Sequence, residues 1–138
     1  MSRTLLIITS LLFVVMSLTA CSGAAPVAET IKCTVDFEAT VYQGPSAGLS
    51  LAGPLALQVD ATGNLTGALT TNDGTSIQLS GQAVGRSINL FFDLGNGKHL
   101  FGVGSLENNM QACKGVGGGP FTGPEPGDSG DWRYSSGG

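Results

Sequence analysis

The sequence predicts an all-β domain: an antiparallel up-and-down meander that closes, or nearly closes, into a small β-barrel. Three observations predict it. Apolar and polar residues alternate over several stretches, which is the period of a half-buried strand. Gly, Asn and Asp residues separate these stretches and supply the positive φ that tight hairpin turns require. No long helix-period pattern appears after residue 30. A β-sandwich is the alternative architecture.

The first 20 residues have the composition of an export signal. Arg3 is the only charged residue before Glu29, and the segment 4–18 that follows it is almost wholly apolar. A positive start, a short apolar stretch and small residues at the end are typical of a secretory signal peptide. A transmembrane helix needs about 20 apolar residues. This run is shorter, and serines interrupt it.

The signal ends in Leu18-Thr19-Ala20-Cys21, which resembles the lipobox of bacterial lipoproteins position by position. The resemblance implies cleavage after Ala20, diacylglycerol on Cys21 and acylation of the new N-terminus. Several acyl chains anchor a protein stably, because each buried methylene contributes about 0.8 kcal/mol. In that family Ser22 permits an outer-membrane destination. We therefore expect an exported protein, lipid-anchored to the outer face of the cell membrane or to the outer membrane.

Cleavage leaves 118 of the 138 residues, enough for one domain. Residues 21–30 are mostly small and predict a flexible tether. Residues 31–116 carry the strand patterns and form the predicted barrel. Residues 117–138 are rich in Gly and Pro and predict a tail, or a cap whose Phe121 and Trp132 plug one end of the barrel.

The strands are predicted in chain order. The first runs from residue 31 to 41, and residues 43–53 read as a loop. Hairpin strands, two weaker strands and a further candidate follow, at 54–60, 64–71, 75–84, 87–94, 98–105, 110–116 and 131–135. This gives six or seven strands, or one more with the candidate. The predicted inner face contains Val35, Phe37, Leu57, Val59, Leu69, Ile77, Leu79, Ile88, Leu90 and Phe92.

A faint repeat supports the meander. Leu51-Ala52-Gly53, Leu65-Thr66-Gly67 and Leu79-Ser80-Gly81 recur every 14 residues, which is about the length of one strand and one turn. Gly67 and Gly81 allow two interpretations of the interior. They open a small apolar cavity, or they let neighbouring strands approach closely.

Two cysteines remain once Cys21 is assigned to lipid. Cys33 and Cys113 in an oxidising compartment predict a disulfide, worth about 4.5 kcal/mol in the chain-entropy model. Cys33 lies in the first predicted strand and Cys113 in the last clear one. A bond between them makes those strands neighbours and closes the sheet into a barrel, although a sandwich would also bring them together.

Composition and motifs argue against several site types. The net charge of −4 becomes −5 without Arg3, so the basic footprint of a nucleic-acid-binding protein is missing. Cys33, Cys113 and His99 lack the clustered spacing of a zinc site. Two carboxylates, Asp128 and Asp131, are few for calcium, which takes six to eight oxygens. No cofactor motif is present in the sequence.

Two serine motifs match catalytic sequence patterns, but the surrounding sequence does not meet the structural requirements of either motif. Residues 44–48, around Ser46, match a nucleophile elbow, but that motif requires a strand turning into a helix. Residues 127–130, around Ser129, resemble the nucleophile region of chymotrypsin-like proteases, in which His, Asp and Ser follow in that order. The only aspartate between His99 and Ser129 is Asp128, the immediate neighbour of the serine, so no orienting carboxylate is available. We expect His99 to be an exposed strand residue beside a turn.

Two classes of function remain. The first is a non-catalytic module that binds a small apolar ligand in the barrel mouth or contacts an envelope protein. The alternative is a small envelope hydrolase with unrecognised catalytic residues. Sparse titratable residues favour the first, because acid–base catalysis needs such groups placed in a pocket. The architecture is similar to avidin and lipocalin barrels. Avidin-type sites have several Trp, whereas Trp132 stands alone.

Overall fold

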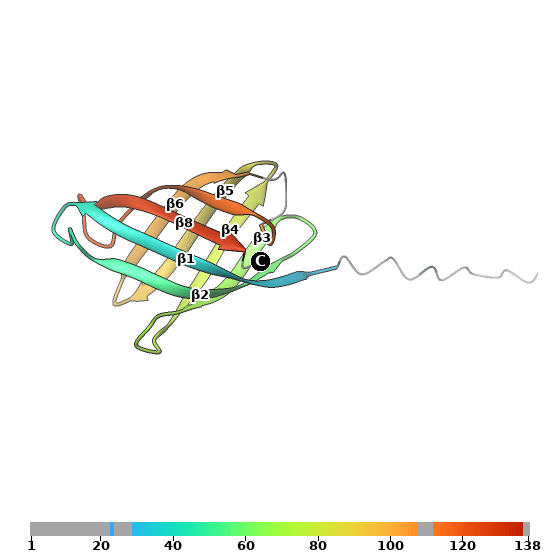
Figure 1. The fold of residues 1–138 in the computed structure, drawn as a ribbon, viewed down its shortest axis with the longest axis horizontal. Helices are drawn as coiled ribbons and strands as arrows, with labels where there is room; N and C mark the ends of the chain where they lie inside the picture. Colours follow the sequence, from blue (N-terminus) through green and yellow to red (C-terminus); the bar gives the residue numbers. More distant parts are fainter. Residues whose placement is uncertain (1–22, 24–28, 108–111, 137–138) are drawn as a thin grey trace, which may run out of the picture.

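Eight antiparallel strands follow one another along the chain and close into a barrel (Figure 1). Each strand pairs with its sequence neighbours, and β1 pairs with β8 to close the ring. The predicted all-β meander and its closure are therefore confirmed. The strands are β1 (Ile31–Gln43), β2 (Ser50–Val59), β3 (Asn64–Thr70), β4 (Ser76–Val84), β5 (Ser87–Gly95), β6 (Lys98–Leu106), β7 (Val116–Thr122) and β8 (Ser129–Ser136).

The computed structural model describes residues 23, 29–107 and 112–136. Within these ranges no helix is long and apolar enough to cross a membrane. The predicted signal peptide, Cys21 and most of the predicted tether lie outside the described residues.

In the predicted strands with clear alternation, the apolar face points into the barrel. In β1, Val35 and Phe37 are buried while Asp36 and Glu38 between them are exposed. The register pairs Val35 with Leu55 of β2, so the apolar faces of neighbouring strands coincide. All ten residues predicted for the inner face are buried, which confirms that prediction. Complete burial of a large aliphatic or aromatic side chain contributes about 1.5–3 kcal/mol.

The segment 117–138 is not a tail. Its described part supplies most of β7 and all of β8, the strands that complete the ring. Phe121 and Trp132 are buried as wall residues of these strands, not as a plug. The sequence concealed β7 because its inward positions are held partly by glycine. A Cβ on Gly117 would lie 2.9 Å from the ring of Tyr134, so β8 fills the space that β7 leaves.

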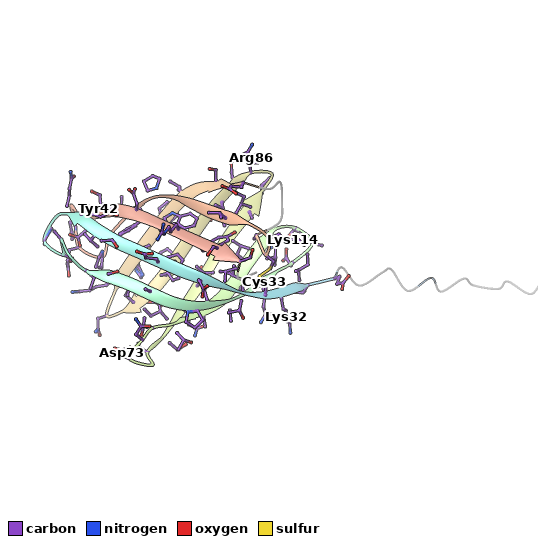
Figure 2. The ribbon with its side chains drawn as sticks, viewed as in Figure 1. Lys32, Cys33, Tyr42, Asp73, Arg86 and Lys114 are labelled. Carbon is purple, nitrogen blue, oxygen red and sulfur yellow. A yellow bond between two sulfur atoms is a disulfide. The ribbon has the colours of Figure 1, made fainter. Side chains whose placement is uncertain are left out.

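The predicted Cys33–Cys113 disulfide is present, with a Cα–Cα distance of 5.7 Å, and Figure 2 places Cys33 close to Lys114. The sequence predicted Cys113 in a strand, but it lies in the connection between β6 and β7. Residues 112–115 form turns and bends, so the strand predicted over 110–116 is wrong over 112–115, and β7 begins at Val116. The bond thus fastens a connection onto β1, while the β1–β8 ladder closes the barrel.

Successive connections of a meander lie at opposite ends of the barrel. The disulfide and the start of β1 define one end, which we call the tether end. Figure 2 shows Lys32, Cys33 and Lys114 there and Tyr42 at the other end. The far rim is the opposite end. It consists of the connections 44–49, 71–75, 96–97 and 123–128.

Candidate functional site

Aromatic side chains fill the middle of the barrel. The Phe37 ring centroid lies 4.8 Å from that of Phe92 and 6.3 Å from that of Trp132. Tyr134 continues the row, 6.0 Å from Trp132. All four residues are at most 2% exposed. The middle of the barrel is therefore occupied by the protein's own core side chains.

Glycines in the wall make this filling possible. A Cβ on Gly102 would lie 2.7 Å from Nε1 of Trp132, so the indole occupies the position of the missing side chain. A Cβ on Gly67 would lie 2.2 Å from the carbonyl oxygen of Ala56, and one on Gly81 would lie 2.2 Å from that of Asn89. The repeated glycines therefore allow close approach of strands, and they do not open a cavity.

Trp132 also satisfies a backbone group of the wall. Its indole N–H donates a hydrogen bond to the carbonyl of Val103 over 3.2 Å. The β6–β7 register is interrupted between Gly102 and Ser105, beside Pro120, a residue with no N–H to donate. The single tryptophan therefore has a structural role in the wall, which accounts for it without a ligand.

The Tyr134 hydroxyl is the buried polar group of the core. It is buried with no hydrogen-bond partner among the described residues. Burial raises the pKa of this phenol far above its usual value, because the charged form loses its hydration. The group stays neutral at physiological pH and is unsuited to act as a general base.

Ser46 takes part in a clamp between two connections of the far rim. Its backbone N–H donates to Oδ1 of Asp128 over 2.8 Å, and the backbone N–H of Glu125 donates to Oδ2 over 2.8 Å. Burial alone would raise the pKa of Asp128. The hydrogen bonds from Ser46 and Glu125, with the charge of Lys98, outweigh it and hold this pKa below its usual range. The carboxylate fastens the β1–β2 connection to the β7–β8 connection.

His99 is exposed on the outer face of β6, as predicted. Its Nδ1 lies 4.0 Å from Oδ1 of Asp93, and its ring centroid lies 4.7 Å from that of Phe91. Within the described residues, neither Ser46 nor Ser129 forms a hydrogen bond with it. The hydroxyl of Ser129 instead faces Oε1 of Gln43 at 3.5 Å. The serine motifs are not assembled with the histidine.

A groove of about 750 Å³, here called the rim groove, runs between the β5–β6 and β7–β8 connections. An ion pair joins Lys98 to Glu125, and hydrogen bonding to Glu125 raises the pKa of Lys98. Across residues 23, 29–107 and 112–136, no three His, Cys, Asp or Glu side chains gather as a metal site would require. The groove is lined by Asn96, Gly97, Lys98, His99 and residues 122–129.

An apolar surface on the outer wall was not predicted. We call Phe91, Phe101 and Val103 the aromatic face. Phe91 of β5 and Phe101 of β6 are cross-strand partners. Phe101 is 45% exposed and Val103 is 44% exposed. The signal was present in the sequence: Phe91-Phe92 and Leu100-Phe101 place apolar residues in both phases of their strands, and only one residue of each pair can face inward.

No protein-family model matches the chain, and no curated protein matches it in sequence.

Proposed function

We propose that the mature chain is a lipid-anchored, non-catalytic binding module that engages its ligand on the outer wall and the far rim. One observation carries this proposal. The core side chains occupy the interior, while Phe101 and Val103 remain exposed on the outside of β6, beside the half-buried Phe91 of β5. A cluster of exposed apolar side chains on the outer wall is typical of an interaction surface.

The proposed anchor is a lipid on Cys21. Residues 22–30 lie between this cysteine and the start of β1, and nine residues span at most about 32 Å when fully extended. The tether would therefore hold the tether end of the barrel near the membrane and leave the far rim directed away from it. The membrane is then the partner reached through the lipid.

The residues of the far rim favour binding over catalysis. Lys98 is paired with Glu125, and both oxygens of Asp128 accept backbone hydrogen bonds. A general acid or base needs a titratable group that is free to exchange a proton with the substrate. These groups instead hold the connections in place.

Cys21→Ala tests the anchor. We expect the wild type to fractionate with membranes, and its intact mass to show cleavage after Ala20 with added acyl chains. The variant should leave the membrane fraction, because no other acylation site follows the signal. Ser22→Ala is the matched control and should remain membrane-bound. Equal membrane binding by Cys21→Ala would overturn the anchor.

The hydrolase alternative has its own test. A panel of ester, peptide and glycoside substrates should give no turnover that depends on the serines or on His99. Measurable hydrolysis that is abolished by Ser46→Ala or by His99→Ala would overturn the non-catalytic proposal. Equal low rates in the wild type and both variants would support it.

A further inference from the structure

We propose that the aromatic face binds an uncharged glycan, which specifies the ligand class of the binding module proposed above and rests on that function. The centre of this face is the cross-strand pair of Phe91 and Phe101. The ring of His99 lies against Phe91 at 4.7 Å with an interplanar angle of 34°. Three rings on neighbouring strands therefore lie together as one platform on the outside of the wall, with Phe101 and His99 exposed and Phe91 half-buried.

Three side-chain amides and one carboxylate frame the platform. The register places Gln78 of β4 opposite Asp93, and Gln82 of β4 opposite Asn89. Asn89 in turn is opposite Val103, and Asp93 is opposite His99. Side-chain amides offer both hydrogen-bond donors and acceptors. The frame can thus exchange hydrogen bonds with hydroxyl groups on either side of the two phenyl rings.

A sugar ring has chemistry that fits this arrangement. Its C–H faces carry partial positive charge and pack against the negative face of an aromatic ring. Its equatorial hydroxyls both donate and accept hydrogen bonds, as the surrounding amides do. Specific small-molecule sites commonly combine apolar contact with a few well-placed polar groups.

The size of the aromatic face disfavours a second copy of this chain. Phe101 is 45% exposed, Val103 is 44% exposed and Phe91 is half-buried. Because even an aromatic side chain has only roughly 150–250 Å² of surface, the aromatic face presents at most a few hundred Å² of apolar surface. A stable protein–protein interface buries about 800 Å² on each partner. A slender ligand such as a glycan chain needs far less area.

Charge disfavours an anionic lipid surface. Lys98 precedes His99 on β6, but its ammonium is paired with Glu125. Asp93, beside His99, adds a negative charge. Attraction to anionic lipids depends on clustered Lys and Arg side chains, whereas this surface offers amides and a carboxylate.

The rim groove extends the proposed site. His99 belongs both to the platform, through Phe91, and to the lining of the rim groove. A chain of several sugar units lying on the phenyl rings would continue past His99 toward Asn96 and Thr122. The site therefore fits an oligosaccharide better than a single sugar.

Saturation-transfer NMR on the purified mature lipoprotein in detergent micelles tests the proposal. The probes are cellohexaose, maltohexaose and chitohexaose at millimolar concentration. We expect at least one of them to receive saturation on its ring protons. Phe101→Ser should raise its Kd about tenfold or more, which corresponds to at least about 1.4 kcal/mol. Phe101→Tyr retains the ring and should bind like the wild type.

Ile31→Ser is the matched control, because Ile31 is also a large exposed apolar residue, 54% exposed, but lies at the start of β1 at the tether end, on a strand that pairs with neither β5 nor β6. It should leave the Kd unchanged. Thermal unfolding of each variant checks that the barrel is intact. Absence of saturation for all three hexasaccharides would overturn the glycan proposal, as would equal binding by Phe101→Ser.

Other occupants of the aromatic face would give distinct results. A dimer seen by light scattering and abolished by Phe101→Ser, or binding of lipid-free protein to phosphatidylglycerol vesicles lost in the same variant, would overturn the glycan proposal. Neither result affects the anchor, because Cys21→Ala fractionation tests that separately. Loss of the anchor would equally leave the glycan assay interpretable, since micelles replace the membrane.

Discussion

Asp128 illustrates how a polar residue in a glycine-rich segment acquires a structural role. The sequence offers it as part of a serine motif or as a calcium ligand. In the structure each carboxylate oxygen accepts one hydrogen bond from a backbone N–H, Oδ1 from Ser46 and Oδ2 from Glu125. A Cβ on Gly44 would lie 2.4 Å from Oδ1 of Asp128. Glycine at this position lets the two connections approach closely enough for the contact.

We predict that Asp128→Ala lowers the free energy of unfolding near neutral pH, because two backbone N–H groups lose their acceptor. The pKa of Asp128 is lower in the folded state than its usual 3.8. Its contribution is therefore present above about pH 4 and is lost as the pH falls through the folded-state pKa.

Urea denaturation at about pH 7 and about pH 3 measures this. The difference between the wild type and Asp128→Ala should shrink at the lower pH. Asp131→Ala removes an exposed carboxylate from β8 and controls for the change in net charge. A difference of equal size at both pH values would contradict the linkage.

At the scale of the elements, large side chains of β8 fill the space that glycines leave on β6 and β7. Gly102 of β6 and Gly117 of β7 lack side chains at the positions where Trp132 and Tyr134 of β8 need room. The inner surface is complete only when all three strands are present. This explains how a strand rich in glycine belongs to a packed barrel.

We predict that Gly102→Ala destabilises the fold by about 1–3 kcal/mol, the usual cost of overpacking a core. The nearest atoms to the new Cβ all belong to the Trp132 side chain. The cost should therefore be smaller in a Trp132→Phe background, a non-additivity that a double-mutant cycle detects. Gly81→Ala is the control, since its Cβ would meet the backbone of Asn89 and Leu90. Strict additivity at Gly102 would contradict the packing described.

This packing of large side chains from one strand over glycines of another limits what the sequence can predict. Most of the strands between 31 and 106 follow from alternation, because most of their inward positions carry their own apolar side chains. The predicted loop over 43–53 is too long, since β1 ends at Gln43 and β2 already begins at Ser50. β7 escapes prediction because Gly117 and Gly119 break the alternation, and their space is filled from another strand. The alternation of β5 already turns Phe92 inward and Phe91 outward, whereas only the fold decides which member of Leu100-Phe101 turns outward on β6.

Across the whole molecule, the disulfide and the β1–β8 ladder hold the barrel in different ways. The ladder closes the ring through seven paired residues from Val35 to Val41. The Cys33–Cys113 bond joins residues 80 apart in sequence and fastens the β6–β7 connection over the tether end. The bond therefore acts mainly by restricting the unfolded chain.

We predict that the double variant Cys33→Ser, Cys113→Ser unfolds with a free energy lower by about 4.5 kcal/mol. Its far-UV circular dichroism should remain that of a β-protein, because the closing ladder does not need the bond. Replacing both residues avoids a free thiol. Wild-type protein treated with a reductant should match the variant in urea denaturation. Unchanged stability after complete reduction would refute the prediction.

An even number of antiparallel strands returns the chain to the side of the barrel from which it started. Ser136 at the end of β8 is paired with Val35 near the start of β1, and Figure 1 marks the C-terminus toward that side. Attachment through the N-terminus or through the C-terminus would therefore give the barrel the same orientation. A graft that moved the attachment from the first residue to the last would still display the same loops to the surroundings.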